Sequence, residues 1–147
     1  MSAVRDLSAA HAEVKAEITR TDSKASLLLA FIGAVLAGVW SAGKDAPLIP
    51  WALVPGLAGI AVLIGAATLL LSSVRPNLSG RHGFPLWATL TPEQIRDAVA
   101  TDTAADIANL SRIAVTKFTA LQRAIDLTRI GGVLLITATV ITLGGAA

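Results

Sequence analysis

The side chains that could catalyse a reaction or hold a metal are spaced in a way that predicts neither activity. The 147 residues include no cysteine, which excludes a thiolate nucleophile and a cysteine metal site. His11 and His82 lie far apart and have no neighbouring ligand pattern. No Ser-His-Asp spacing, phosphate loop or HExxH motif occurs, so we expect no catalytic residue, no metal and no bound cofactor. Three aspartates are typical of a solvated face and of the start of a helix: Asp97, Asp102 and Asp106.

The composition and the uncharged stretches predict a membrane protein. Apolar residues make up 54% of the chain and charged residues 15%, whereas about 25% charged residues is typical of soluble domains. A net charge of +2 from scattered residues does not favour a nucleic-acid partner. About 20 apolar residues cross a hydrocarbon core of roughly 30 Å. We therefore predict one domain, residues 1–147, that is all-α and has three transmembrane helices in the lipid bilayer: 25–43, 51–74 and 130–147. A soluble bundle rarely contains three such runs.

The distribution of lysine and arginine predicts the orientation. Four precede the first span, one (Lys44) lies between the first two spans, and seven lie between the second and third. The excess of basic residues marks the cytoplasmic side. We expect residues 1–24 and 75–129 in the cytoplasm, the C-terminus outside, and the protein in the inner membrane. Lys24, Arg75 and Arg129 would then mark one inner surface. No span would carry a charge in its core, and a permanently open pore is not indicated.

Two cytoplasmic helices are predicted to form a stalk. A mostly apolar stripe, interrupted by His11 and Thr21, recurs at alternating spacings of three and four before the first span: Val4, Leu7, His11, Val14, Ile18, Thr21 and Ala25. A long helix is expected from about Thr103 into the third span, with one inner face: Ile107, Leu110, Ala114, Lys117, Leu121 and Ala124. Both helices run toward the membrane and should pack in parallel. Asp22 would pair with Lys117, while Lys24 reaches for lipid headgroups.

Two further local patterns are informative. Thr91-Pro92-Glu93-Gln94 predicts a short helix that begins with a capping box, in which Thr91 and Gln94 bind each other's backbone N–H. Small residues also recur within the first two spans, where they favour close helix contacts, including those of a homo-oligomer: Ala30, Ala34 and Gly38, Gly33 and Ala37, and Gly56, Gly59 and Gly65.

Two segments carry a resemblance to a known family. They are residues 16–33, which contain Asp22-Ser23-Lys24-Ala25-Ser26 at the entry to the first span, and residues 109–125. Together with Arg75-Pro76 and the helix start at 90–95, they resemble the transmembrane effectors of Pycsar antiphage systems, over about residues 13–134. The resemblance implies a bacterial defence protein that impairs the inner membrane and halts growth of the infected cell. A partner cyclase would make the activating ligand, cyclic UMP or cyclic CMP.

That resemblance implies a ligand pocket between the stalk helices. The candidate ligand-binding side chains are Arg20, Thr21, Asp22, Lys24, Arg112, Lys117 and Arg123. The arginines and Lys117 would neutralise the phosphate, and Thr21 and Asp22 would bind the ribose or the base edge. Three alternatives stay open. The charges at the membrane could be purely structural, the chain could be a constitutive membrane anchor or scaffold that docks a soluble partner, or it could be a holin-like lysis protein.

Overall fold

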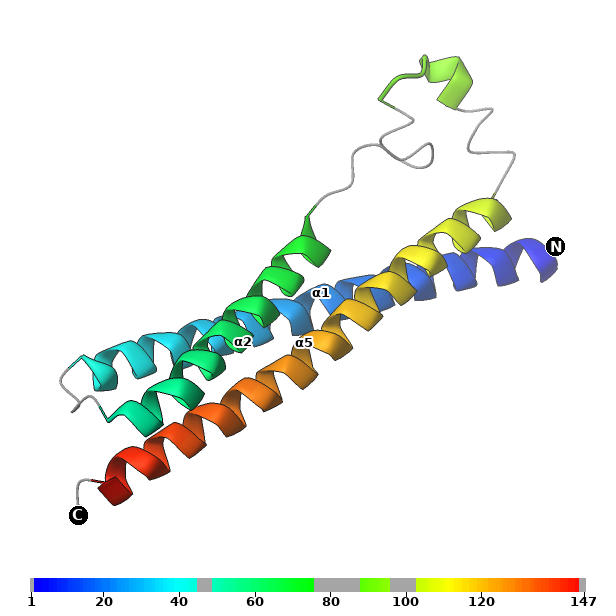
Figure 1. The fold of residues 1–147 in the computed structure, drawn as a ribbon. Helices are drawn as coiled ribbons and strands as arrows, with labels where there is room; N and C mark the ends of the chain where they lie inside the picture. Colours follow the sequence, from blue (N-terminus) through cyan, green and yellow to red (C-terminus); the bar gives the residue numbers. More distant parts are fainter. Residues whose placement is uncertain (1, 45–48, 76–87, 96–102, 146–147) are drawn as a thin grey trace. The chain divides into compact units, whose positions relative to one another are not determined.

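Three long helices make up the computed structural model (Figure 1), which describes residues 2–44, 49–75, 88–95 and 103–145. They are α1 (Ser2–Gly43), α2 (Pro50–Val74) and α5 (Thr103–Gly145). The described residues contain no strand, and each of the three helices is long and apolar enough to cross a membrane. The predicted all-α fold with three spans is confirmed, and the chain is a multi-pass membrane protein. His82, Asp97 and Asp102 lie outside the described residues.

Local sequence explains where the helices begin. The N–H groups of Ala52 and Leu53 both donate to the carbonyl of Ile49, at 3.0 and 3.2 Å, so α2 begins at Pro50, where proline's missing N–H is not needed. The predicted capping box is confirmed at a single helical turn, residues 92–95. There Thr91 N donates to Gln94 Oε1 at 2.9 Å, and Gln94 N donates to Thr91 Oγ1 at 3.4 Å.

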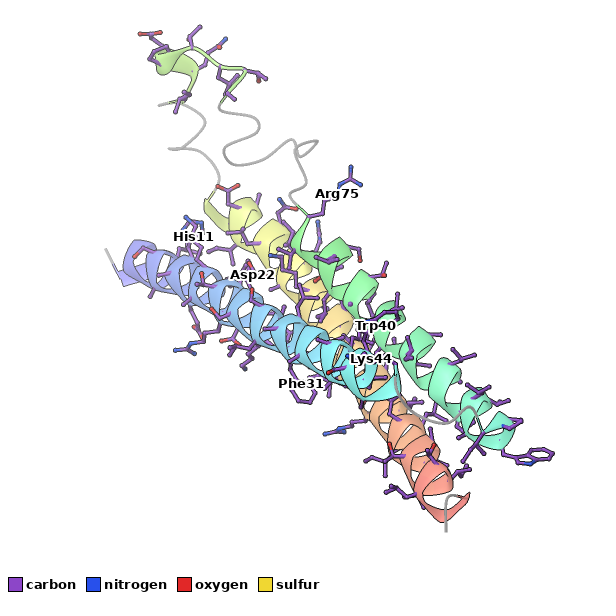
Figure 2. The ribbon with its side chains drawn as sticks, turned by 90° about the vertical axis from the view of Figure 1, so that its left-hand side faces the viewer. His11, Asp22, Phe31, Trp40, Lys44 and Arg75 are labelled. Atoms are coloured by element: carbon purple, nitrogen blue, oxygen red, sulfur yellow. The ribbon has the colours of Figure 1, made fainter. Side chains whose placement is uncertain are left out.

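The chain divides into two compact units, each described by itself. The stalk unit consists of residues 1–22 and 74–118, and the span unit of residues 23–73 and 119–147. In the stalk unit the first part of α1 and the first part of α5 run in the same direction (Figures 1 and 2). The predicted parallel pairing of these two segments is therefore confirmed. Burial along the α1 stripe rises from Leu7, which is 38% exposed, to Thr21, which is 2% exposed.

In the span unit the rest of α1, all but the last residue of α2, and the rest of α5 pack around one apolar core. The buried core residues are Ala25, Ile32, Leu63, Ala66, Leu70, Leu121 and Ala124. Helix α2 runs antiparallel to the other two (Figure 1). The stripes on α1 and α5 supply their share of this core because both are apolar at helical spacing.

Glycines set the closest approach between α2 and α5. A Cβ added at Gly131 would lie 2.8 Å from Leu63 Cγ, and one added at Gly59 would lie 3.0 Å from the carbonyl oxygen of Gly131. By contrast, a Cβ at Gly33 or Gly38 would meet nothing within 4 Å. Of the small residues singled out in the first two spans, those of α2 at positions 56 and 59 contact α5, whereas those of α1 face outward.

Candidate functional site

An ion pair joins the two helices of the stalk unit. Lys117 Nζ donates to Asp22 Oδ1 at 2.6 Å and to Asp22 Oδ2 at 2.8 Å. The Lys117 side chain is 20% exposed and that of Asp22 is 40% exposed. Because the Lys117 side chain is mostly buried, the two charges attract each other more strongly than a fully exposed pair does. The expected pairing of Asp22 with Lys117 is confirmed.

A buried hydroxyl lies next to this pair along α1. Thr21 is 2% exposed, and its Oγ1 donates to the carbonyl of Glu17 at 2.9 Å. This bond satisfies the hydroxyl as a donor but leaves its oxygen able to accept. Thr21 and Asp22 therefore add an acceptor and a carboxylate to the part of the stalk that also holds the Lys117 ammonium.

Two more polar side chains of the stalk unit are partly shielded from solvent. His11 and Asp22 lie on the side of α1 that faces α5 (Figure 2). His11 and Ser111 are both half-buried, and Ser111 Oγ donates to the carbonyl of Ile107 at 2.8 Å. Sequence reasoning did not select Ser111 as a site residue. Its place one turn after Ile107 and one turn before Ala114, which both belong to the predicted inner face of α5, is the signal that could have selected it.

The remaining candidates do not meet at the ion pair. Arg20 is two residues before Asp22 and Arg112 is five before Lys117, so each is turned well away from its neighbour on a helix of 3.6 residues per turn. Arg20 makes an exposed pair with Glu17, at 3.4 Å, and Arg112 is exposed. Lys24 and Arg123 belong to the span unit, and both are exposed. The structure thus brings together Asp22 and Lys117, with Thr21 beside them.

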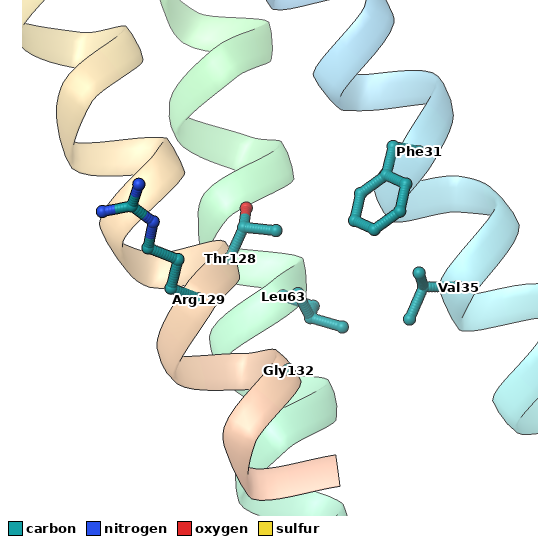
Figure 3. Close-up of a pocket in the computed structure, with 6 residues that line it drawn as sticks. All are labelled: Phe31, Val35, Leu63, Thr128, Arg129 and Gly132. Carbon is teal, nitrogen blue, oxygen red and sulfur yellow. The ribbon is translucent and has the colours of Figure 1, made fainter. Parts of the chain in front are cut away.

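The span unit holds an apolar pocket of about 260 Å³ (Figure 3). Its lining comes from all three helices: Phe31, Val35, Leu63, Thr128, Arg129 and Gly132. The hydroxyl of Thr128 donates to the carbonyl of Ala124 at 2.7 Å, so Arg129 is the one charged group in the lining. Such a pocket suits a hydrocarbon chain better than a nucleotide, whose base and ribose need several hydrogen-bonding partners. Among the residues that the structure describes, no three histidine, aspartate or glutamate side chains gather to hold a metal ion.

Comparison with protein families finds a match to the Pycsar effector protein domain (PycTM) over residues 6–144. Neither the curated proteins nor the solved structures gave a match. The matched region takes in nearly all of α1, the whole of α2 and nearly all of α5, and therefore both the stalk ion pair and the three candidate spans. By this match the chain belongs to the Pycsar effector family, the transmembrane effectors of an antiphage defence system.

Proposed function

We propose that this protein senses cyclic UMP or cyclic CMP through its stalk unit and then impairs the inner membrane, which halts growth of the infected cell. Family membership supports the defence role. The observation that carries the sensing role is the half-buried Asp22–Lys117 pair next to the buried hydroxyl of Thr21. Burying charges is costly, so a seam that served only to hold two helices together would be expected to be apolar.

The chemistry of the pair matches that of the ligand. A cyclic mononucleotide carries one negative charge on its phosphodiester, which the Lys117 ammonium would bind in place of the Asp22 carboxylate. Asp22, once released, would accept a hydrogen bond from the ribose 2′-hydroxyl or from the base edge. Thr21 could accept a further bond. The exposed residues Arg20, Lys24, Arg112 and Arg123 stay predicted ligand-binding residues, and in a homo-oligomer they could reach a nucleotide held by a neighbouring copy.

The link from ligand to membrane is a change in helix packing. Lys117 can bind both oxygens of Asp22 only while α1 and α5 keep their present register in the stalk unit. A ligand shifts an equilibrium between packing states only by its differential affinity for them, and a tenfold preference supplies about 1.4 kcal/mol. In this proposal the stalk unit and the N-terminus are cytoplasmic, the C-terminus is outside, a partner cyclase supplies the nucleotide, and a homo-oligomer acts on the bilayer.

Binding and membrane potential can be measured on matched variants. The full-length protein in detergent is titrated with cyclic UMP and cyclic CMP, and cells that express it are assayed for depolarisation when either nucleotide is supplied. We expect the wild type to bind one nucleotide and to depolarise the cells. Lys117→Met should lose both responses, and Lys15→Gln, an exposed change on α1, should keep both. If the wild type responds to neither nucleotide, or if folded Lys117→Met responds normally, the sensing role is rejected.

The same ion pair gives the competing function its support. Because Asp22 and Lys117 satisfy each other without a ligand, they could simply fasten the stalk of a constitutive anchor that docks a soluble protein. That function predicts harmless overexpression, no nucleotide binding and co-purification of a partner. Lys117→Glu separates the two functions, since it should abolish a nucleotide response in the first and merely weaken folding in the second.

A further inference from the structure

Asp126 and Arg129 place two charges on the outer surface of the span unit. Their side chains are 70% and 78% exposed, and Arg129 Nη1 lies 4.0 Å from Asp126 Oδ1. Charge-assisted hydrogen bonds are shorter, about 2.7–2.9 Å, so the two groups neutralise each other weakly. The hydroxyls of four threonines on α5 are better satisfied than these two charges, because each donates a hydrogen bond to the carbonyl four residues earlier: Thr128, Thr137, Thr139 and Thr142.

The contacts between α2 and α5 show how far along the bundle this pair lies. A Cβ at Gly131 would touch Leu63, and a Cβ at Gly56 would lie 3.6 Å from Ala138 Cβ. The step from Leu63 back to Gly56 on α2 thus matches the step from Gly131 forward to Ala138 on α5, seven residues in each case, as expected for antiparallel helices. The same register places Ser73, near the end of α2, level with Leu121.

The contacts of α1 give the same level. Phe31 and Val35 line one pocket with Thr128 and Gly132 (Figure 3), and α1 and α5 run in parallel. Seven residues before Phe31 is Lys24, and seven before Thr128 is Leu121. Lys24 is therefore level with Leu121, in agreement with the packing of Ala25 and Leu121 in one core.

With Lys24 and Lys44 taken as the two membrane surfaces, this register places Asp126 and Arg129 within the hydrocarbon layer. Arg129 follows Leu121 by eight residues, or about 12 Å at 1.5 Å per residue, and Asp126 by five, or about 8 Å. On α1 the charges that flank the first span, Lys24 and Lys44, are twenty residues apart, which is about 30 Å and matches a hydrocarbon core. If Lys24 and Lys44 mark the two membrane surfaces, the third span begins near Leu121, before the predicted start at residue 130, and Arg129 lies deeper than Lys24.

We propose that Asp126 and Arg129 form the element that perturbs the bilayer, by drawing lipid phosphate and water into the hydrocarbon layer. The inference rests on the proposed function and names the residues that carry it out. A lipid-facing charge at this depth is tolerated through snorkelling, local thinning and water defects, and the planar guanidinium of Arg129 matches a phosphate group. The apolar pocket beside Arg129 offers room for part of an acyl chain of the same phospholipid.

Water access at this depth can be measured directly, because the chain has no cysteine of its own. A nitroxide on Ile130→Cys is read for collisions with a water-soluble nickel complex, in vesicles of phosphatidylethanolamine and phosphatidylglycerol. We expect nickel access to fall at least fivefold when Asp126→Leu and Arg129→Leu are added. A nitroxide on Gln122→Cys, near the level of Lys24, is the control and should stay accessible in both backgrounds. Equal access at Ile130→Cys in the two backgrounds would overturn the proposal.

Dye release from the same vesicles tests whether Arg129 permeabilises the bilayer. With cyclic UMP or cyclic CMP present, Arg129→Leu should release dye at least tenfold more slowly than the wild type and still bind nucleotide, whereas Val133→Leu, a lipid-facing control, should match the wild type. Release at the wild-type rate from Arg129→Leu refutes the inference alone. A wild type that releases no dye refutes the proposed function, whatever the nitroxide shows. If Arg129→Leu no longer forms an oligomer while nickel access at Ile130→Cys is unchanged, Asp126 and Arg129 contact a second copy of the chain, and lipid binding is refuted.

Discussion

Replacing Gly131 by alanine would probe the closest contact between α2 and α5. The added Cβ would lie 2.8 Å from Leu63 Cγ and 3.2 Å from the carbonyl oxygen of Gly59. Leu63 is 1% exposed, so it has little free space into which it can move. Overpacking of this kind costs about 1–3 kcal/mol, whereas removing a glycine from a helix gains about 0.5–1 kcal/mol. The expected result is a net loss of stability.

The next residue provides a matched control. A Cβ at Gly132 would meet nothing within 4 Å. Gly132→Ala should therefore gain the stability that comes from removing a glycine from a helix, without the cost of a steric clash. The difference between the two variants then isolates the steric term, about 1–3 kcal/mol. At roughly 4 °C per kcal/mol for a chain of this length, Gly131→Ala should unfold about 4–12 °C below Gly132→Ala.

The measurement is the midpoint temperature at which the detergent-solubilised protein loses its folded peak in size-exclusion chromatography. Helix content alone is a poor readout, because detergent preserves helices after their packing is lost. Equal midpoints for the two variants would show that α2 and α5 are not in close contact at Gly131. The alignment of α2 with α5 that sets the level of Arg129 would then be wrong.

Two further predictions use the same assay. In a double-mutant cycle, Asp22→Asn and Lys117→Met should show a coupling free energy of unfolding of about 1 kcal/mol, which is the upper end of the range for exposed ion pairs. A coupling free energy near zero would show that the ion pair does not form in solution. Ile32→Ala should cost about 2–5 kcal/mol because Ile32 is 1% exposed, whereas Leu27→Ala, at a position 73% exposed, should change stability by about 0.5 kcal/mol or less. Similar losses of stability for Ile32→Ala and Leu27→Ala would show that Ile32 does not lie in the core of the span unit.

Features encoded in neighbouring residues were predictable from the sequence. The capping box needs only Thr91 and Gln94 three residues apart. The pairing of Asp22 with Lys117 was predictable for a different reason, since a charge on an otherwise apolar stripe demands a partner on the helix that the stripe faces. The long helix from Thr103 followed from the absence of proline and glycine before Gly131.

Other features depend on how the helices are rotated and aligned, which spacing does not encode. Gly33 and Gly59 both belong to rows of small residues, yet Gly59 packs against Gly131 and Leu135 while Gly33 faces outward, because the bulky core side chains set the rotation of each helix. The depth of Arg129 in the membrane is a related case. Its position in the sequence marks the start of an uncharged run, but its depth depends on which residues of α1 and α2 lie beside it.

In the proposed mechanism, two indole rings at the other end of the span unit would confine the effect of Arg129 to one leaflet of the bilayer. Trp40, near the end of α1, and Trp51, near the start of α2, are 78% and 81% exposed. Tryptophan prefers the headgroup region, so these rings hold their end of the bundle at that interface. Thinning caused by Arg129 would then fall on the leaflet nearer Arg129 and not on the leaflet that holds the two rings. A bilayer that is thinned in one leaflet curves, so the proposed homo-oligomer would be expected to bend the bilayer in addition to permeabilising it.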